Sequence, residues 1–281
     1  MTLRAVAHTM TPISTSDGAG VRMQRSIGTQ MLDHFDPFLL LDDFKSEDSA
    51  DYIAGFPDHP HRGFERVTYM IAGRMRHEDH TGAGGSLGPG GVQWMTAGRG
   101  IIHSEMPEQE EGLMHGFQLW VNLPAKDKMI PPRYQNIEPE DVPDAALSGG
   151  GTAKVIAGTC QGVTGPINGI ATDPLYLDVK LPAGASFRQS VTQGHNAFVY
   201  VFEGAAAIHG ENGHVTETSG RKLAMLADGD EVEVSSRDGA ARFLLVAGRP
   251  INEPIARYGP FVMNTREEIQ QAFMDYQAGR F

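Results

Sequence analysis

Four side chains in two short stretches of the sequence could together bind a metal ion. His59 and His61 stand one residue apart in "FPDHPHRGFERV", and His103 and Glu105 have the same spacing in "GRGIIHSEMP". Side chains two positions apart on a strand point to the same face, so two neighbouring strands could direct both pairs to one point. Imidazole and carboxylate suit a borderline divalent metal such as iron, and three or four protein ligands leave positions open for water, substrate or O2.

Glu65 is a second carboxylate that strand geometry alone would allow as a ligand. It has the same parity along the chain as His59 and His61. The histidine pair is a weak signal by itself, because eleven histidines in 281 residues give about 0.4 such pairs by chance. Glycines frame both stretches, with Gly73 after the first and Gly98 before the second, which strengthens the case for two related strand segments.

The segments that must position these residues have the character of strands. Apolar, β-branched and aromatic residues recur in "RVTYMIAG", "VQWMTAG", "GFQLWVNLP", "TAKVIAG", "LYLDVKLPAG", "AFVYVFEG" and "ARFLLVAG". The 34 glycines and 17 prolines indicate many short strands joined by tight turns. A Pro-, acid- and Gly-rich stretch over residues 123–151 is typical of a connection between domains. We therefore expect an all-β protein with two domains, residues 1–135 and 136–281.

Only the last segment has a helical pattern. Thr265 and Glu268 predict a capping box, Ile269, Phe273 and Met274 form an apolar stripe, and Gly279 stops the run. One short C-terminal helix is expected.

The composition excludes several classes of protein. With 23 Lys and Arg against 35 Asp and Glu, the net charge is −12, and no basic cluster of the kind that tracks nucleic-acid phosphates occurs. No segment has the apolar length of a membrane span or a signal peptide, so a cytoplasmic protein is expected. Cys160 is the only cysteine, which excludes an internal disulfide and a cysteine-based metal site, and we expect it to be a small buried residue.

These motifs resemble those of the cupin superfamily. Gly55, His59, His61, Glu65 and Gly73 resemble the first cupin motif, with seven residues where six usually precede the final glycine. Gly90, Thr96, Gly98 and His103 resemble the second motif, with Thr in place of Pro and two residues added. These departures, together with "HPHRGFE", "QWMTAGRGIIHSEMP", "GFQLWVNLPAKDKM" and "EPIARYGPFVMNT", resemble the pirin branch of the superfamily.

The resemblance implies two cupin domains, which are jelly-roll-like β-barrels, and one metal, usually iron, in the N-terminal barrel. It selects His59, His61, His103 and Glu105 as ligands and leaves Glu65 a supporting position. In the second half, the corresponding ligand places fall on Val191, Gln193 and Ala197, with His195 alone between them. We therefore expect the C-terminal cupin to be metal-free and structural.

Other histidines are weaker candidates. His77 and His80 are expected to flank a solvated turn, with Glu78 a residue that could lie near the metal pocket. His115 could hold a ligand through a hydrogen bond or have a structural position only.

The resemblance supports two functions. The first is an Fe(II)-dependent dioxygenase of the quercetinase type, which cleaves the flavonol heterocyclic ring with O2 and releases carbon monoxide. Glu105 would take the hydroxyl proton at the metal. Residues expected to line the substrate pocket, if they are not simply core residues, are Phe56, Phe64, Trp94 and Met106. The alternative is an iron- or redox-sensing protein that binds a transcription factor or metabolic enzyme without essential catalysis and without direct contact to nucleic acid.

Overall fold

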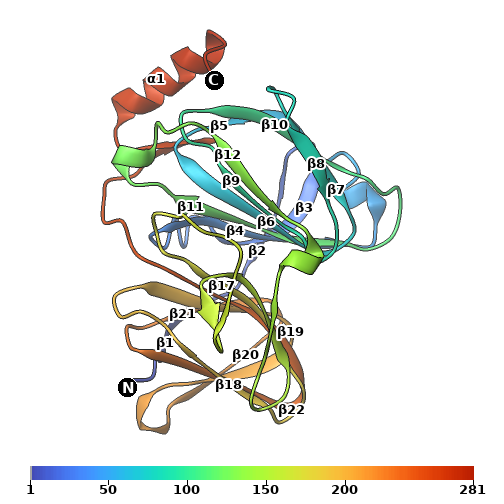
Figure 1. The fold of residues 1–281 in the computed structure, drawn as a ribbon, viewed down its shortest axis with the longest axis vertical. Helices are drawn as coiled ribbons and strands as arrows, with labels where there is room; N and C mark the ends of the chain where they lie inside the picture. Colours follow the sequence, from blue (N-terminus) through green and yellow to red (C-terminus); the bar gives the residue numbers. More distant parts are fainter. Residues whose placement is uncertain (1) are drawn as a thin grey trace. The chain divides into compact units, whose positions relative to one another are not determined.

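A computed structural model describes residues 2–281 and shows, over that range, a chain of β-strands with one α-helix near the C-terminus (Figure 1). The expectation of an all-β protein with a short C-terminal helix is confirmed. Within the same range, the structure has no helix with the length and apolar character that crossing a bilayer requires.

The described chain forms two compact units. The histidine unit contains Ile13–Glu140 and Ile251–Phe281, and the second unit contains residues 2–12 and Asp141–Pro250. These units differ from the expected domains, 1–135 and 136–281, at both ends of the chain. β1 (Val6–Met10) adds to the second unit by pairing with β21 (Lys222–Leu226). The C-terminal helix belongs to the histidine unit, where Arg62 forms a 2.7 Å ion pair with Asp275. Such long-range pairings cannot be read from local patterns.

Two antiparallel sheets make up most of the histidine unit. The first has the order β12-β9-β6-β11-β4-β3-β2, and the second has the order β5-β10-β7-β8. The strands of the first sheet are β2 (Ile13–Asp17), β3 (Val21–Ile27), β4 (Phe38–Ser46), β6 (Phe64–Ala72), β9 (Val92–Thr96), β11 (Met114–Asn122) and β12 (Arg133–Ile137). The strands of the second sheet are β5 (Phe56–His61), β7 (Met75–Asp79), β8 (Gly84–Leu87) and β10 (Ile101–Pro107). The remaining elements are β23 (Ala256–Tyr258), β24 (Phe261–Met263) and 3₁₀ helices at Ser49–Asp51, Ala125–Asp127 and Pro139–Asp141, the last reaching into the second unit.

The two sheets enclose a shared core. β11 is buried at every position, so both of its faces are covered, as expected for a central strand. Met70 from β6, Met75 from β7 and Phe56 from β5 belong to one apolar cluster, which joins the first sheet to the second. β5 and β10 are thereby held over the inner face of β6 and β11.

The C-terminal helix α1 (Arg266–Gln277) begins at the expected capping box. The Thr265 side chain accepts from the Glu268 backbone N–H, and the Glu268 side chain accepts from the Thr265 N–H. Ile269 is buried against β24 together with Ala272, and Phe273 is partly buried there. The expected apolar stripe is wrong at Met274, which is 51% exposed, because Ala272 takes the contact position instead.

The second unit is a nine-stranded sheet arrangement around a large apolar core. Its path is β1-β21-β19-β22-β17-β14-β13, with β18 paired to β22 and β20 paired to β19. Its other strands are β13 (Asp144–Ala146), β14 (Thr152–Ala157), β17 (Leu175–Leu181), β18 (Ser186–Ser190), β19 (Asn196–His209), β20 (Val215–Ser219), β22 (Glu231–Gly248) and the separate pair β15 (Thr159–Cys160) and β16 (Val163–Thr164). A 3₁₀ helix spans Glu211–Gly213.

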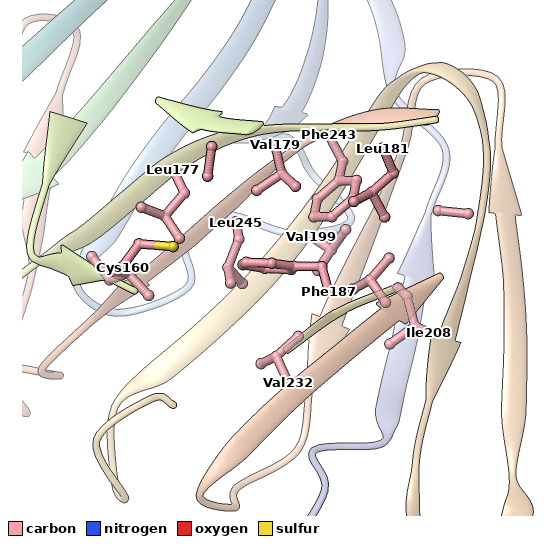
Figure 2. Packing of buried hydrophobic residues seen from close by; sticks show 14 of the residues in the cluster. Cys160, Leu177, Val179, Leu181, Phe187, Val199, Ile208, Val232, Phe243 and Leu245 are labelled. Atoms are coloured by element: carbon pink, nitrogen blue, oxygen red, sulfur yellow. The ribbon is translucent and has the colours of Figure 1, made fainter. Parts of the chain in front are cut away.

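Cys160 is fully buried in this core, as expected for a small apolar residue (Figure 2). Its neighbours in the same cluster include Leu177 and Leu245 from the adjacent strands β17 and β22. The two halves of β22 pair with different strands, Glu231–Ser235 with β18 and Ala241–Ala247 with β17.

Candidate metal centre

Strand pairing brings the two histidine-containing stretches together. β5 and β10 are antiparallel neighbours, and His103 lies directly opposite His59, with Ile101 opposite His61. Directly opposed residues on one face have Cβ atoms about 5 Å apart, so their side chains can bind the same metal ion. The i, i+2 spacing of His59 and His61 on β5 adds the third imidazole to the same face, as the sequence predicted.

The three imidazoles form a compact cluster. Their ligand nitrogens all lie within 4.8 Å of one another, and the ring centroids are 4.6 Å apart for His59 and His61, 4.6 Å for His59 and His103, and 5.1 Å for His61 and His103. His61 and His103 are buried, and His59 is half-buried. Among residues 2–281, His, Cys, Asp and Glu side chains gather in this way only here.

The ring nitrogens have the hydrogen-bonding pattern of ligands. His59 Nδ1 lies 2.8 Å from the Pro57 carbonyl, which can only accept, so Nδ1 carries the proton and Nε2 keeps a free lone pair. Within residues 2–281, neither ring nitrogen of His61 has a hydrogen-bond partner, although both are buried. A buried polar atom without a partner is costly, and a cation at the cluster would supply that partner.

The cluster favours neutral imidazoles, the form that binds metals. Burial, followed by the charge of Arg66, lowers the pKa of His59 to about 4. Burial, followed by the neighbouring imidazoles of His59 and His103, holds the pKa of His61 well below its ordinary value. Burial and then Arg66 do the same to the pKa of His103. Three neutral nitrogen donors with lone pairs to share fit a divalent transition metal.

Glu105 is buried beside the histidines, but its carboxylate is bound to other groups. It forms an ion pair with the Arg66 guanidinium and accepts a 3.1 Å hydrogen bond from the Thr68 hydroxyl. It is not one of the group whose ligand atoms lie within 4.8 Å of one another. In this structure the Glu105 carboxylate, which is expected to be the fourth ligand, is therefore bound by Arg66 and Thr68 of β6.

Arg66 is the principal residue of the site that the sequence analysis missed. Its side chain is fully buried, and Nη1 lies 2.8 Å from His103 Nε2. Burial lowers the pKa of Arg66 to about 9, so the guanidinium stays charged at neutral pH. A charged residue at the start of the strand-like run "RVTYMIA" was the available signal, since a buried charge needs a partner.

Glu65 points to the other side of β6. Its carboxylate accepts a 2.8 Å hydrogen bond from Thr96 on β9, and burial raises its pKa to about 7. Thr96 is also its register partner, so the two side chains share the face of the sheet opposite to Arg66. Glu65 is therefore remote from the cluster, in agreement with a supporting position.

Among the other histidines, the expectation for His77 is wrong. His77 is buried on β7 opposite Glu105, not on a solvated turn, and burial followed by Arg66 lowers its pKa.

His80 is exposed, with Nε2 3.1 Å from the Phe281 carbonyl. Glu78 is exposed and paired with Arg76, away from the pocket. 

His115 is buried with Nε2 3.2 Å from Asp43. This partner lies on β4, so the structure gives His115 a contact that does not involve the three histidines.

A pocket of about 560 Å³ opens on the cluster. Its volume is in the usual range for small-molecule sites. Its lining includes the site residues His59, His61 and Arg66, the apolar residues Leu40, Phe56 and Trp120, and the polar residues Arg25, Gln118 and Arg257.

Of the four expected pocket residues, Phe56 alone lines this pocket. Trp94 is a fully buried core residue, Met106 is 37% exposed, and Phe64 packs behind Trp120 with ring centroids 4.3 Å apart. The aromatic side chain presented to the pocket is instead Trp120, whose ring is 5.4 Å from that of His61.

Arg257 gives the pocket a cation that no carboxylate neutralises directly. Its guanidinium lies 4.9 Å over the Trp120 ring and donates to the Leu39 carbonyl at 3.1 Å. Within residues 2–281, no carboxylate oxygen lies within ion-pair distance of it. Arg25, by contrast, is bound by both oxygens of Asp42, at 2.8 and 2.7 Å.

The second unit presents no comparable arrangement at the places where a second cupin site would lie. Val191 and Ala197 are buried apolar residues, and Gln193 is exposed. His195 is buried with Nε2 3.9 Å from Asp173, and its backbone carbonyl accepts from Arg4.

Comparison with known proteins gives concordant matches along the chain. A family model described as Pirin matches residues 20–121, and one described as Pirin C-terminal cupin domain matches residues 176–281. A Pirin-like protein from Caulobacter vibrioides is 53% identical, with 100% of each chain covered. Human Pirin is 45% identical over 93% of this chain and 88% of its own. The crystal structure of a quercetin 2,3-dioxygenase from Acinetobacter baumannii superimposes with a TM-score of 0.89 at 35% identity, covering 99% and 98% of the chains. The expected resemblance and the two cupin domains are confirmed.

Proposed function

Because the chain belongs to the pirin family, we propose that it is a metal-dependent dioxygenase of the quercetinase type. Its substrates would be a flavonol and O2. The heterocyclic ring is cleaved, both oxygen atoms enter the ring-opened product, and one ring carbon leaves as carbon monoxide. The observation that carries the proposal is the cluster of three imidazoles beside the pocket of about 560 Å³ lined by Trp120 and Arg257.

Fe(II) is the proposed metal, held by His59, His61 and His103, with Glu105 as the proposed fourth ligand. Bound there, it would polarise the flavonol hydroxyl as a Lewis acid and bring substrate and O2 together. His59 fits this assignment through the hydrogen bond of Nδ1 to Pro57, which fixes the ring with Nε2 toward the cluster. His61 fits it through its two unpaired buried nitrogens.

Glu105 is the proposed proton acceptor of the reaction. The carboxylate lies in the buried site next to His103 and takes the 3-hydroxyl proton of the flavonol. Thr68 holds the other side of the carboxylate through its hydrogen bond to Oε1, which keeps Glu105 in place while it changes partners.

The pocket can bind the flavonol anion that this proton transfer produces. Deprotonated flavonol is negatively charged, and the guanidinium of Arg257, which has no carboxylate in ion-pair contact within residues 2–281, is a suitable partner for that charge. Leu40, Phe56 and Trp120 supply the apolar surface that an aromatic ring system needs.

Aerobic turnover tests the proposal directly. The protein is loaded with Fe(II) and mixed with quercetin in air, and loss of flavonol absorbance is followed together with carbon monoxide release. We expect turnover above that of free iron, and loss of turnover in His59→Ala. Full metal loading with no turnover would exclude the quercetinase activity.

A second proposed function is an iron- or redox-sensing protein that binds a protein partner without essential catalysis. It is favoured by the ion pair of Glu105 with Arg66, because a change of metal state would redistribute these buried charges. Hydrogen exchange of the Fe(II)- and Fe(III)-loaded protein tests it. Protection that differs in β5, β6 and β10, in a protein without turnover, would favour sensing, and identical protection would argue against it.

A further inference from the structure

The Arg66 guanidinium occupies a position that matters to any metal at the histidine cluster. We propose that Arg66 is an internal cation that competes with the metal for Glu105 and His103, so that the centre binds metal through three histidines with a carboxylate ligand that is only partly available. This inference rests on the metal site of the proposed function and concerns metal binding, not turnover.

The contacts of Arg66 place it in direct competition. Nη2 donates to the Glu105 carboxylate, and Nη1 lies 2.8 Å from His103 Nε2. A guanidinium nitrogen only donates, so the Nε2 atom at this contact must offer its lone pair. A metal ion that binds His103 through Nε2 needs that same lone pair, and a metal at the cluster also attracts the carboxylate that Arg66 holds.

The residues around Arg66 offer its guanidinium few other partners for hydrogen bonds or ion pairs. The side chain is fully buried on β6, and no group in the described part of the chain forms a hydrogen bond with its Nε atom. Its only carboxylate partner within residues 2–281 is Glu105. When Glu105 turns to a metal, the guanidinium is left beside a second positive charge in a buried site, which disfavours that arrangement.

Glu105 is held in a position from which its carboxylate can exchange Arg66 for a metal ion. Thr68 on the same strand as Arg66 donates to Glu105 Oε1 at 3.1 Å, which leaves Oε2 as the atom that Arg66 binds. Removing the charge of Arg66 should therefore free one oxygen of a carboxylate that stays anchored by the other. The predicted consequence is tighter metal binding, gained specifically through Glu105.

Metal affinity in a double-mutant cycle tests this proposal. Ni(II) and Co(II) dissociation constants are measured by competition with a chelator for wild type, Arg66→Met, Glu105→Gln and the double variant. We expect Arg66→Met to bind about tenfold more tightly or better. We also expect Glu105→Gln to cost at least about ten times more affinity in the Arg66→Met background than in wild type. The Co(II) absorption spectrum should change on Arg66→Met and change back in the double variant.

Controls separate this effect from unfolding and from loss of activity. Arg242→Met removes a guanidinium that is bound by both oxygens of buried Asp178 in the second unit, and metal affinity should be unchanged. Arg66→Gln keeps a neutral donor for Glu105, removes the charge, and should bind metal more tightly even if Arg66→Met does not fold. Quercetin turnover is not used, so an inactive protein leaves the result intact.

Each result of these measurements either supports or overturns the competition between Arg66 and the metal. Metal binding by Arg66→Met or Arg66→Gln where wild type binds none would support the proposal in its strongest form. Equal or weaker binding in the folded Arg66 variants would overturn it. An equal cost of Glu105→Gln in both backgrounds, or no metal binding by any variant, would overturn it as well.

Discussion

His103 on β10 lies directly opposite His59 on β5, and this pairing converts two separate sequence motifs into one cluster. Because antiparallel register fixes which side chains meet, the cluster depends on both strands and not on either motif alone. His61 completes the cluster from the same face of β5 as His59, and among the described residues neither of its buried ring nitrogens has a hydrogen-bond partner.

Replacing His61 by Ala should therefore abolish most metal binding. Loss of one of three imidazoles should weaken the metal affinity by more than about 100-fold, since even residues that only orient ligands contribute 10–100-fold. Metal content after dialysis against a weak chelator, measured by elemental analysis, checks this. His34→Ala is the matched control, because His34 is exposed and paired with Asp33. Equal metal content in wild type and His61→Ala would remove His61 from the ligand set.

Arg257→Gln should weaken binding of an anionic flavonol without changing metal content. The guanidinium at the pocket has no carboxylate partner within residues 2–281, so a charge-assisted hydrogen bond to substrate is lost. Such bonds contribute roughly 1.5–3 kcal/mol, which corresponds to a rise in Kd or KM of about 10–100-fold. Anaerobic titration with quercetin, followed by absorbance, measures it.

The control for Arg257 is Arg22→Gln. Arg22 is 75% exposed and paired with Asp51 outside the pocket lining, so its replacement should leave Kd unchanged. A Kd that is the same in Arg257→Gln and wild type would show that the substrate charge is recognised elsewhere.

Residue type and spacing predict the all-β fold and indicate that two strands could bring the three histidines together. The i, i+2 rule needs only the strand itself, and the strands were evident from their residue types and glycine punctuation. The helix start was predictable for the same reason, because the capping box of Thr265 and Glu268 is local. By contrast, the exchange of chain ends between the two units depends on β1 pairing with β21, which no local pattern specifies.

The pocket residues were not predictable because they depend on register across strands. Trp120 stands opposite Arg66, so its side chain shares the face toward the cluster. Trp94 stands opposite Val67, one position along β6, and therefore lies on the other face. A one-residue difference in pairing decides which tryptophan lines the pocket, and no single local run of the sequence specifies that register.

Cys160 should be inert to thiol reagents in the native protein. It is fully buried, and burial raises the pKa of its thiol to about 11, so little thiolate forms at neutral pH. We expect no reaction with Ellman's reagent until the protein unfolds, and one thiol per chain afterwards. Cys160→Ala should lower the free energy of unfolding by about 1–2 kcal/mol and leave metal content unchanged. Rapid native labelling would show that the second unit opens around β15.

Lys128 should make stability depend on pH above neutrality. Its ammonium is buried and donates to the carbonyls of Gly63 and Val262 and to the Asn122 side chain, at 2.7, 3.0 and 2.7 Å. Burial lowers its pKa to about 7 from an ordinary value of 10.5. Between these values the unfolded chain carries the proton and the folded one does not, so the unfolded state binds more protons and stability rises with pH.

The expected slope from Lys128 is at most about 1.4 kcal/mol per pH unit between about pH 7 and 10. Urea unfolding of wild type and Lys128→Met at pH 7 and pH 9 isolates it, because other titrating groups contribute equally to both proteins. The free energy of unfolding of wild type relative to Lys128→Met should increase by about 2 kcal/mol between the two pH values. A difference that stays constant would mean that Lys128 remains charged in the fold, with its three acceptors compensating for burial.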